Sequence, residues 1–197
     1  MKLRVGALAA SLCLPAAGAA GAPTRLYLKA HYLDGKGQTH QLVMWRDGDR
    51  LRRDTDEKLS LYVTHGRDDR FRVVDKGRKI AYDVRRTNLY RIGTFTDWSS
   101  LTTLVHEPAN APPLAKSGEP ALTTQAGVCR WRVAPDRRYC WSSSWQLPLL
   151  VERQTTEGWK NVLTVEEVRS GKPPAGTFEL PADVSLIDVD RDVDPND

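Results

Sequence analysis

The sequence lacks the local motifs that mark the common enzyme classes. No Gly-x-Ser-x-Gly segment surrounds the serines at 99–100 or 142–144, and no glycine-rich phosphate loop or Cys-x-x-Cys pair is present. The four histidines are dispersed along the chain at His31, His40, His65 and His106. Because no nucleophile or acid–base pair emerges, we expect a protein that is not an enzyme and that needs no cofactor.

A metal site is equally hard to build from this sequence. A hairpin turn centred on Gly35-Lys36 would place His31 opposite His40, but two imidazoles without a third ligand bind metal poorly. Residues 188–197 resemble the start of a calcium loop, yet the glycine at its sixth position and the closing glutamate are missing. We expect solvated strand histidines and, at residues 191–197, an acidic tail.

Long apolar runs are missing beyond the first 22 residues. The start of the chain is typical of a secretory signal peptide: a short basic region at 1–4, an apolar run at 5–15 and small residues at 16–22. Cleavage is expected after Ala19. The apolar run is too short to span a bilayer. We therefore expect export to the periplasm, removal of residues 1–19, one domain at residues 20–190, and a mature protein that does not span the membrane.

Charge is divided unevenly along the chain. Residues 24–100 hold 17 Lys and Arg against 11 Asp and Glu, whereas residues 101–197 hold 10 against 14. The basic residues are interleaved with aspartates rather than clustered, so we favour solvated strand faces and expect no nucleic-acid partner. Whether the basic half contacts membrane headgroups as a peripheral protein stays open.

Cysteine is scarce: once the signal peptide is removed, only Cys129 and Cys140 remain. Two cysteines in an exported chain favour a single structural disulfide over a metal site or a redox dithiol. A hairpin turn centred on Ala134-Pro135 would place the two cysteines directly opposite each other, close enough to be bridged.

Apolar and polar residues alternate with a period of two through most of the mature chain, and turn residues interrupt the runs at short intervals. Strands are expected at 26–32, 38–46, 51–54, 59–65, 71–75, 79–84, 128–133, 138–141, 145–152, 162–165 and 184–188. The fold class is therefore mainly β, with one large curved antiparallel sheet that forms a half-barrel and with one or a few short helices over its concave face.

Residues 97–107 are the exception, because Leu101, Leu104 and Val105 share one helical face and Asp97 or Ser99 can cap the helix. A proline-rich and alanine-rich loop follows at 107–121. A short helix and a long loop against a curved sheet would plug or cover its hollow. The candidate ligand-binding residues are Trp98, Leu101, Leu104 and Val105 from this helix, with Met44 and Trp45 from the sheet.

The order of these elements resembles the periplasmic lipoprotein-carrier superfamily, the LolA/LolB-like proteins and their RseB N-terminal relatives. The resemblance lies in the meander from Leu26 to Val84, the helix with Trp98, the loop, the segments 145–152 and 162–168, and the ending Phe178-Glu179-Leu180-Pro181. It implies an eleven-stranded half-barrel that binds something apolar.

Two functions follow as expectations from that resemblance. One is a non-enzymatic carrier of a lipid, a lipoprotein acyl chain or another apolar ligand. The other is a regulatory domain of the RseB type that contacts a periplasmic or envelope protein. An open apolar hollow favours carriage, and a hollow filled by side chains favours interaction with a protein.

Overall fold

The computed structural model describes residues 23–85, 97–105 and 111–192. The predicted signal peptide, its cleavage site, His106 and most of the predicted acidic tail lie outside these residues. The elements run in the order β1 (Arg25–Leu33), β2 (Thr39–Asp47), β3 (Arg50–Thr55), β4 (Leu59–Thr64), β5 (Arg70–Asp75), β6 (Ile80–Arg85), α2 (Trp98–Thr103), β7 (Ala115–Lys116), β8 (Leu122–Thr124), β9 (Gly127–Val133), β10 (Arg137–Ser142), β11 (Leu147–Thr155), β12 (Gly158–Arg169), β13 (Ser185–Asp188) and α3 (Val189–Asp192).

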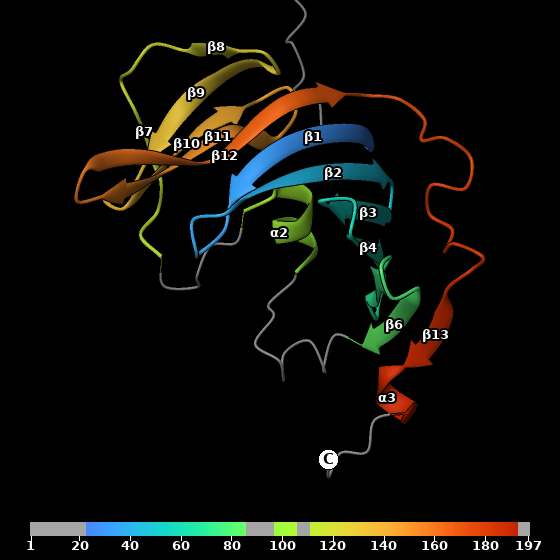
Figure 1. Cartoon of the computed structure of the whole chain (residues 1–197). Helices are drawn as coiled ribbons and strands as arrows, with labels where there is room; N and C mark the ends of the chain where they lie inside the picture. Colours follow the sequence, from blue (N-terminus) through green and yellow to red (C-terminus); the bar gives the residue numbers. More distant parts are fainter. Residues whose placement is uncertain (1–22, 86–96, 106–110, 193–197) are drawn as a thin grey trace, which may run out of the picture.

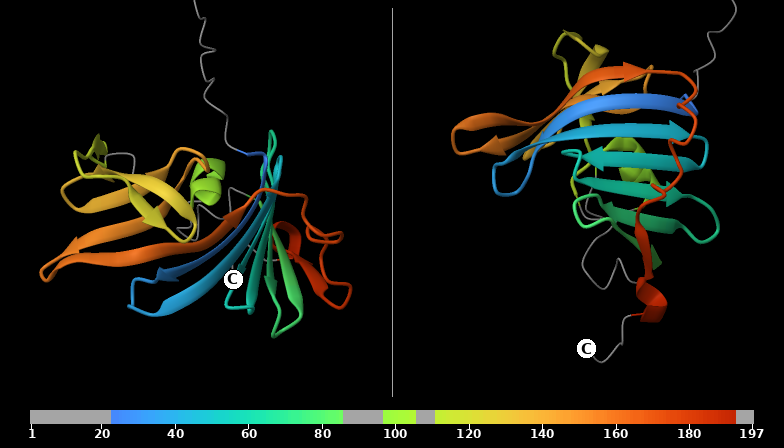
Figure 2. Two further views of the ribbon diagram at one scale, coloured as in Figure 1. Left: turned by 90° about the horizontal axis from the view of Figure 1, so that it is seen from above. Right: turned by 45° about the vertical axis from the view of Figure 1, so that its right-hand side comes forward.

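All thirteen described strands belong to one open sheet in the order β13-β6-β5-β4-β3-β2-β1-β12-β11-β10-β9-β7, and β8 pairs with β9. Every pairing is antiparallel except that of β13 with β6. The two arms of the sheet bend away from a common plane, and α2 lies on the concave side between them (Figures 1 and 2). The predicted mainly β fold, a curved sheet with a short helix on its concave side, is confirmed; thirteen short strands replace the eleven that the resemblance implied.

Strand alternation produces the inner, concave face of the sheet. In β1, Leu26, Leu28 and Ala30 are fully buried. On β2, Met44 lies opposite Leu28 and Leu42 lies opposite Ala30. Together with side chains from β9 to β12 and from α2, these residues form the main core. Burying an aliphatic side chain of this size contributes about 1.5–3 kcal/mol, so the inner face supplies most of the driving force for folding.

The first hairpin has a different register from the one predicted. Tyr32, not His31, lies opposite His40. The reason is a wider turn: the amide of Asp34 donates to the carbonyl of Gln38, and Gly37 adopts a φ of 81° that favours glycine. His40 therefore shares a face with Tyr32 and not with His31. His31 alternates with the buried Ala30, so it lies on the outer face, 2.7 Å from a carboxylate oxygen of Glu166.

The second hairpin contains the predicted disulfide in an unpredicted register. Cys129 and Cys140 are bridged with an S–S distance of 2.07 Å, which confirms the pair. However, Cys140 lies opposite Trp131, because the amide of Ala134 donates to the carbonyl of Arg137 and centres the turn one residue later than expected. The bridge is therefore diagonal rather than directly cross-strand, with a Cα–Cα distance of 5.2 Å.

Residues 170–184 connect β12 to β13 along the outer face of the sheet, as the right-hand view of Figure 2 shows. Arg52 donates to the carbonyl of Thr177 at 3.1 Å, and the Arg50 guanidinium lies 4.7 Å from the centre of the Phe178 ring. Leu180 and Val184 pack against a small outer cluster of Tyr62, Val74 and Ala81. This connection therefore covers part of the outer face of the sheet.

None of the helices in the described part of the chain has the length and apolar character needed to cross a bilayer.

Candidate functional site

A cavity of about 530 Å³ lies on the inner face where strands β10 to β12 meet β1 to β3. Its volume falls within the range of roughly 300–1,000 Å³ that small-molecule sites occupy. Most of the lining side chains are aliphatic or aromatic. The lining residues are Tyr32, Leu33, Asp34, Gly35, Leu42, Arg53, Leu104, Val105, Tyr139, Val151, Arg153, Val162 and Leu163.

The C-terminal end of α2 forms one wall of this cavity. Asp97 caps the helix, because its carboxylate accepts the amide of Ser100 at 2.8 Å, and Leu101 is buried in the core. The helix ends earlier than the predicted residue 107, because Leu104 adopts the left-handed conformation with a φ of 63°. That turn directs the chain so that Leu104 and Val105 line the cavity.

The conformation of Leu104 is costly for a side chain of its kind. Left-handed backbone costs an ordinary residue roughly 1–2 kcal/mol, and glycine is the usual choice at this position of a helix end. Strained backbone of this type is concentrated at ligand-binding and catalytic positions. Of the five described non-glycine residues with positive φ, Leu104 is the one that lines the cavity.

Trp98 docks the helix instead of lining the cavity. Its ring stacks on the imidazole of His65 with a centroid distance of 4.7 Å and an interplanar angle of 4°. His65 is itself held by Asp69, since Nδ1 lies 2.6 Å from the carboxylate. Trp98 thus ties α2 to the turn between β4 and β5, and it is not among the residues that line this cavity.

The two strand residues of the prediction lie on opposite faces. Met44 is fully buried in the inner core without lining the cavity. Trp45 lies on the outer face, 4.4 Å from the Tyr27 ring and beneath the Arg169 guanidinium. Neighbouring residues of a strand point to opposite sides, so Met44 and Trp45 could not share a cavity. Of the six predicted residues, Leu104 and Val105 line it.

Sequence reasoning missed the most unusual lining residue, Arg53. It lies in an inner-face row between Met44 of β2 and Leu61 of β4, where the other positions are apolar. Burial lowers the pKa of the Arg53 guanidinium, whereas the nearby Tyr32 raises it. The alternation of β3 contained the signal: because Leu51 points inward, Arg53 must do so as well.

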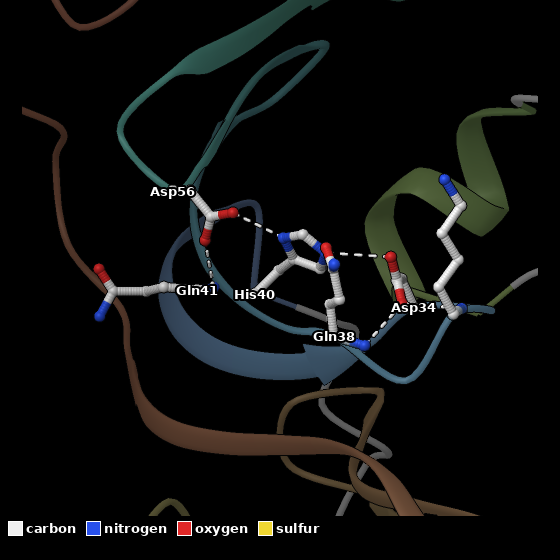
Figure 3. A network of polar contacts seen from close by, with 6 residues as sticks. Asp34, Gln38, His40, Gln41 and Asp56 are labelled. Atoms are coloured by element: carbon white, nitrogen blue, oxygen red, sulfur yellow. Dashed lines mark hydrogen bonds and ion pairs between the residues drawn. The ribbon is translucent and has the colours of Figure 1, made fainter.

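A second polar feature borders the cavity at the first hairpin. His40 lies between two carboxylates, with Nδ1 2.6 Å from Asp56 and Nε2 3.3 Å from Asp34 (Figure 3). The Asp34 carboxylate also accepts the amides of Lys36 and Gln38, each at 2.8 Å. The cluster joins the β1–β2 hairpin to the β3–β4 turn. Tyr32, which lines the cavity, stacks on the His40 ring at 5.2 Å.

The electrostatics of this cluster favour a charged imidazole between charged carboxylates. Hydrogen bonds to Asp56 and then to Asp34 raise the pKa of His40. The backbone amide of Gln38 is the main cause of the lowered pKa of Asp34, and the hydrogen bond from His40 is the main cause for Asp56. With one charged imidazole between two charged carboxylates, the cluster keeps a net negative charge, and the shorter contact of His40 is the one to Asp56.

Within the described residues, no group of three or more histidine, cysteine, aspartate or glutamate side chains is placed to hold a metal ion. The side chains around the cavity provide a hydrophobic wall and two guanidinium groups, from Arg53 and Arg153. An arrangement of this kind can bind an apolar group and an anion.

No protein-family model matches this chain, and no curated protein matches it in sequence. The resemblance to the lipoprotein carriers therefore stays a prediction based on the residues named above.

Proposed function

We propose that this chain is an exported, non-catalytic protein that holds a lipid or an acyl chain in the inner-face cavity. The observation that supports the proposal is the cavity of about 530 Å³ with aliphatic and aromatic walls. Apolar surface that a folded protein leaves unfilled gains free energy when an apolar ligand covers it. A hollow of this kind is what the carrier hypothesis requires.

The size of the expected effect follows from the hydrophobic contribution of a chain. Each buried methylene contributes about 0.8 kcal/mol, so on the order of ten methylenes would contribute about 8 kcal/mol before the cost of association. Because about 8 kcal/mol alone corresponds to a micromolar affinity, the affinity for a simple acyl chain is expected to be weaker than micromolar after that cost. Such an affinity is measurable and is compatible with loading and release.

Export is the second part of the proposal. The basic and apolar start of the sequence is typical of a signal peptide, and the Cys129–Cys140 disulfide fits an oxidising compartment such as the periplasm. Fractionation of cells that express the full chain tests this directly. Retention of residues 1–19 on protein recovered from the cytoplasm would contradict it.

Native mass spectrometry of protein purified from the periplasm, followed by organic extraction, tests the binding function. An acyl species bound in a fixed ratio would support the proposal and name the class of cargo. A clean mass without ligand, together with no uptake of an apolar fluorescent probe, would favour the rival function, a domain that contacts an envelope protein.

A pair of tryptophan variants tests whether the probe enters this cavity. Val162 lines the cavity and is partly exposed, so Val162→Trp should fill the space and weaken uptake of the probe by about tenfold or more. Val128 of β9 is exposed and lies outside the cavity, so Val128→Trp serves as the matched control. Equal uptake by both variants would remove the cavity from the proposal.

A further inference from the structure

Arg53 is a charged side chain at an inner-face position of β3 whose cross-strand neighbours are apolar. Its cross-strand neighbours are Met44 and Leu61, and the next inner-face row of β3 contains Leu51, which is fully buried. Removing a guanidinium from water costs several kcal/mol unless an anion or hydrogen-bond acceptors replace the water. Arg53 is partly exposed at the cavity, so an anion bound there would offset part of that cost.

The described part of the chain does not provide Arg53 with such an anion. Arg53 forms no ion pair and no side-chain hydrogen bond with any residue there, unlike its neighbour Arg52, which binds Asp54 through two nitrogens. Asp34 is the single carboxylate that lines the cavity, and His40 bonds both it and Asp56. Most of the lining residues are thus aliphatic or aromatic, and the two arginines outnumber the one carboxylate.

Arg153 adds a second positive charge to the same cavity. It lies on β11 and is exposed to solvent; the pKa of nearby Asp136 is lowered mainly by the hydrogen bond from Arg137 and less by the charge of Arg153. The two guanidinium groups have different surroundings, since Arg53 is half-buried on the inner face and Arg153 lies at the solvent side. A ligand with its acyl chain against the apolar walls would meet a positive charge at Arg53.

We infer that the apolar ligand bears an anionic headgroup, a carboxylate or a phosphate, and that Arg53 binds that headgroup. The inference rests on the proposed function, because it specifies the chemistry of the ligand in the same cavity. Guanidinium groups suit both anions, since their fixed fork of N–H donors matches two oxygens at once. A fatty acid and an acyl phosphate ester share this chemistry.

Displacement of an apolar fluorescent probe by four ligands with the same twelve-carbon chain tests the inference. Dodecanoate and dodecyl phosphate carry the anion, dodecanol is neutral, and dodecyltrimethylammonium is cationic. All four are used below their micelle concentrations. The full-length mature protein should prefer the anions over dodecanol by about tenfold or more, because a charge-assisted hydrogen bond contributes about that factor. The order of the two anions identifies the headgroup.

Arg53→Met keeps the volume and removes the charge. It should abolish the preference for anions and leave the affinity for dodecanol within about twofold. Arg130→Met, at an exposed position of β9 outside the cavity, removes the same charge and should leave the preference intact. Arg53→Gln gives a second variant, and thermal melts verify that each variant folds. Arg53→Met should melt at the same or a higher temperature than the wild type, because a desolvated charge is removed.

The outcomes separate the two proposals. If all four ligands displace the probe equally from the wild type and from Arg53→Met, the headgroup inference is wrong while the apolar site stands. If neither the probe nor any of the ligands binds the wild type, the proposed function fails and the inference with it. A preference for the cation would likewise overturn the assignment of Arg53.

Discussion

Replacement of both cysteines of the Cys129–Cys140 disulfide by alanine should destabilise the protein by about 3 kcal/mol. The bridged residues are 11 apart in the sequence. Opening a loop of this length returns about 9–10 cal/mol/K of entropy to the unfolded chain, which is about 3 kcal/mol at 25 °C. The β9–β10 ladder remains in place without the bridge. The variant should therefore fold, with a melting temperature about 6–12 °C lower.

Urea unfolding measures this loss. The free energy of unfolding should be high for the oxidised wild type. It should be lower, and similar, for the wild type in reductant and for the double alanine variant. Uptake of an apolar probe below the melting temperature should not change, since neither cysteine lines the cavity. A loss below about 1 kcal/mol would refute the entropic reasoning. Two free thiols in the oxidised, denatured protein would refute the bridge itself.

Three further predictions concern the cavity and its borders. His40→Gln should lower the melting temperature below about pH 6.5, and the difference should shrink as pH rises through the raised pKa of His40, because the stabilisation exists while the imidazole is protonated. A difference constant from pH 5.5 to 8.5 would contradict this. Leu104→Gly should be more stable in urea than Leu104→Ala by about 1 kcal/mol, because glycine tolerates the left-handed backbone, while both weaken probe binding; equal stabilities would show that the backbone is unstrained. Trp98→Ala should cost about 1–3 kcal/mol by removing the stack on His65. Its effect on probe binding, measured by titration, should be smaller than that of Val162→Trp, and an unchanged melting temperature would contradict the docking role.

The first six strands were predictable because their signals are local. Each of β1 to β6 begins and ends within two residues of its predicted range. Turn residues such as Asp34-Gly35 and Asp47-Gly48 separate alternating runs, and both signals act over a few residues. The cap of α2 at Asp97 was predictable for the same reason.

Register and long-range pairing were not predictable from the same signals. The turns that follow β1 and β9 are each centred later in the sequence than the predicted centres, Gly35-Lys36 and Ala134-Pro135. Different residues therefore lie opposite one another across each hairpin. The parallel pairing of β13 with β6 joins segments about a hundred residues apart, and no local pattern specifies it. The cavity was predicted in outline, but its lining depends on these pairings. Arg53 and Tyr139 therefore went unnoticed as lining residues.

Two of the residues that line the cavity depart from local rules. Arg53 places a charge in an apolar row, and Leu104 holds a bulky side chain on left-handed backbone. They come from different elements, the third strand and the end of the helix, so no shared local cause explains them. A sequence usually agrees with its fold at every level, and exceptions are concentrated where function requires them. A mere packing defect would need neither a guanidinium without an ion-pair partner among the described residues nor a leucine on left-handed backbone. The convergence of the partly buried charge and the strained backbone on one cavity favours the proposed binding site over an imperfectly filled core.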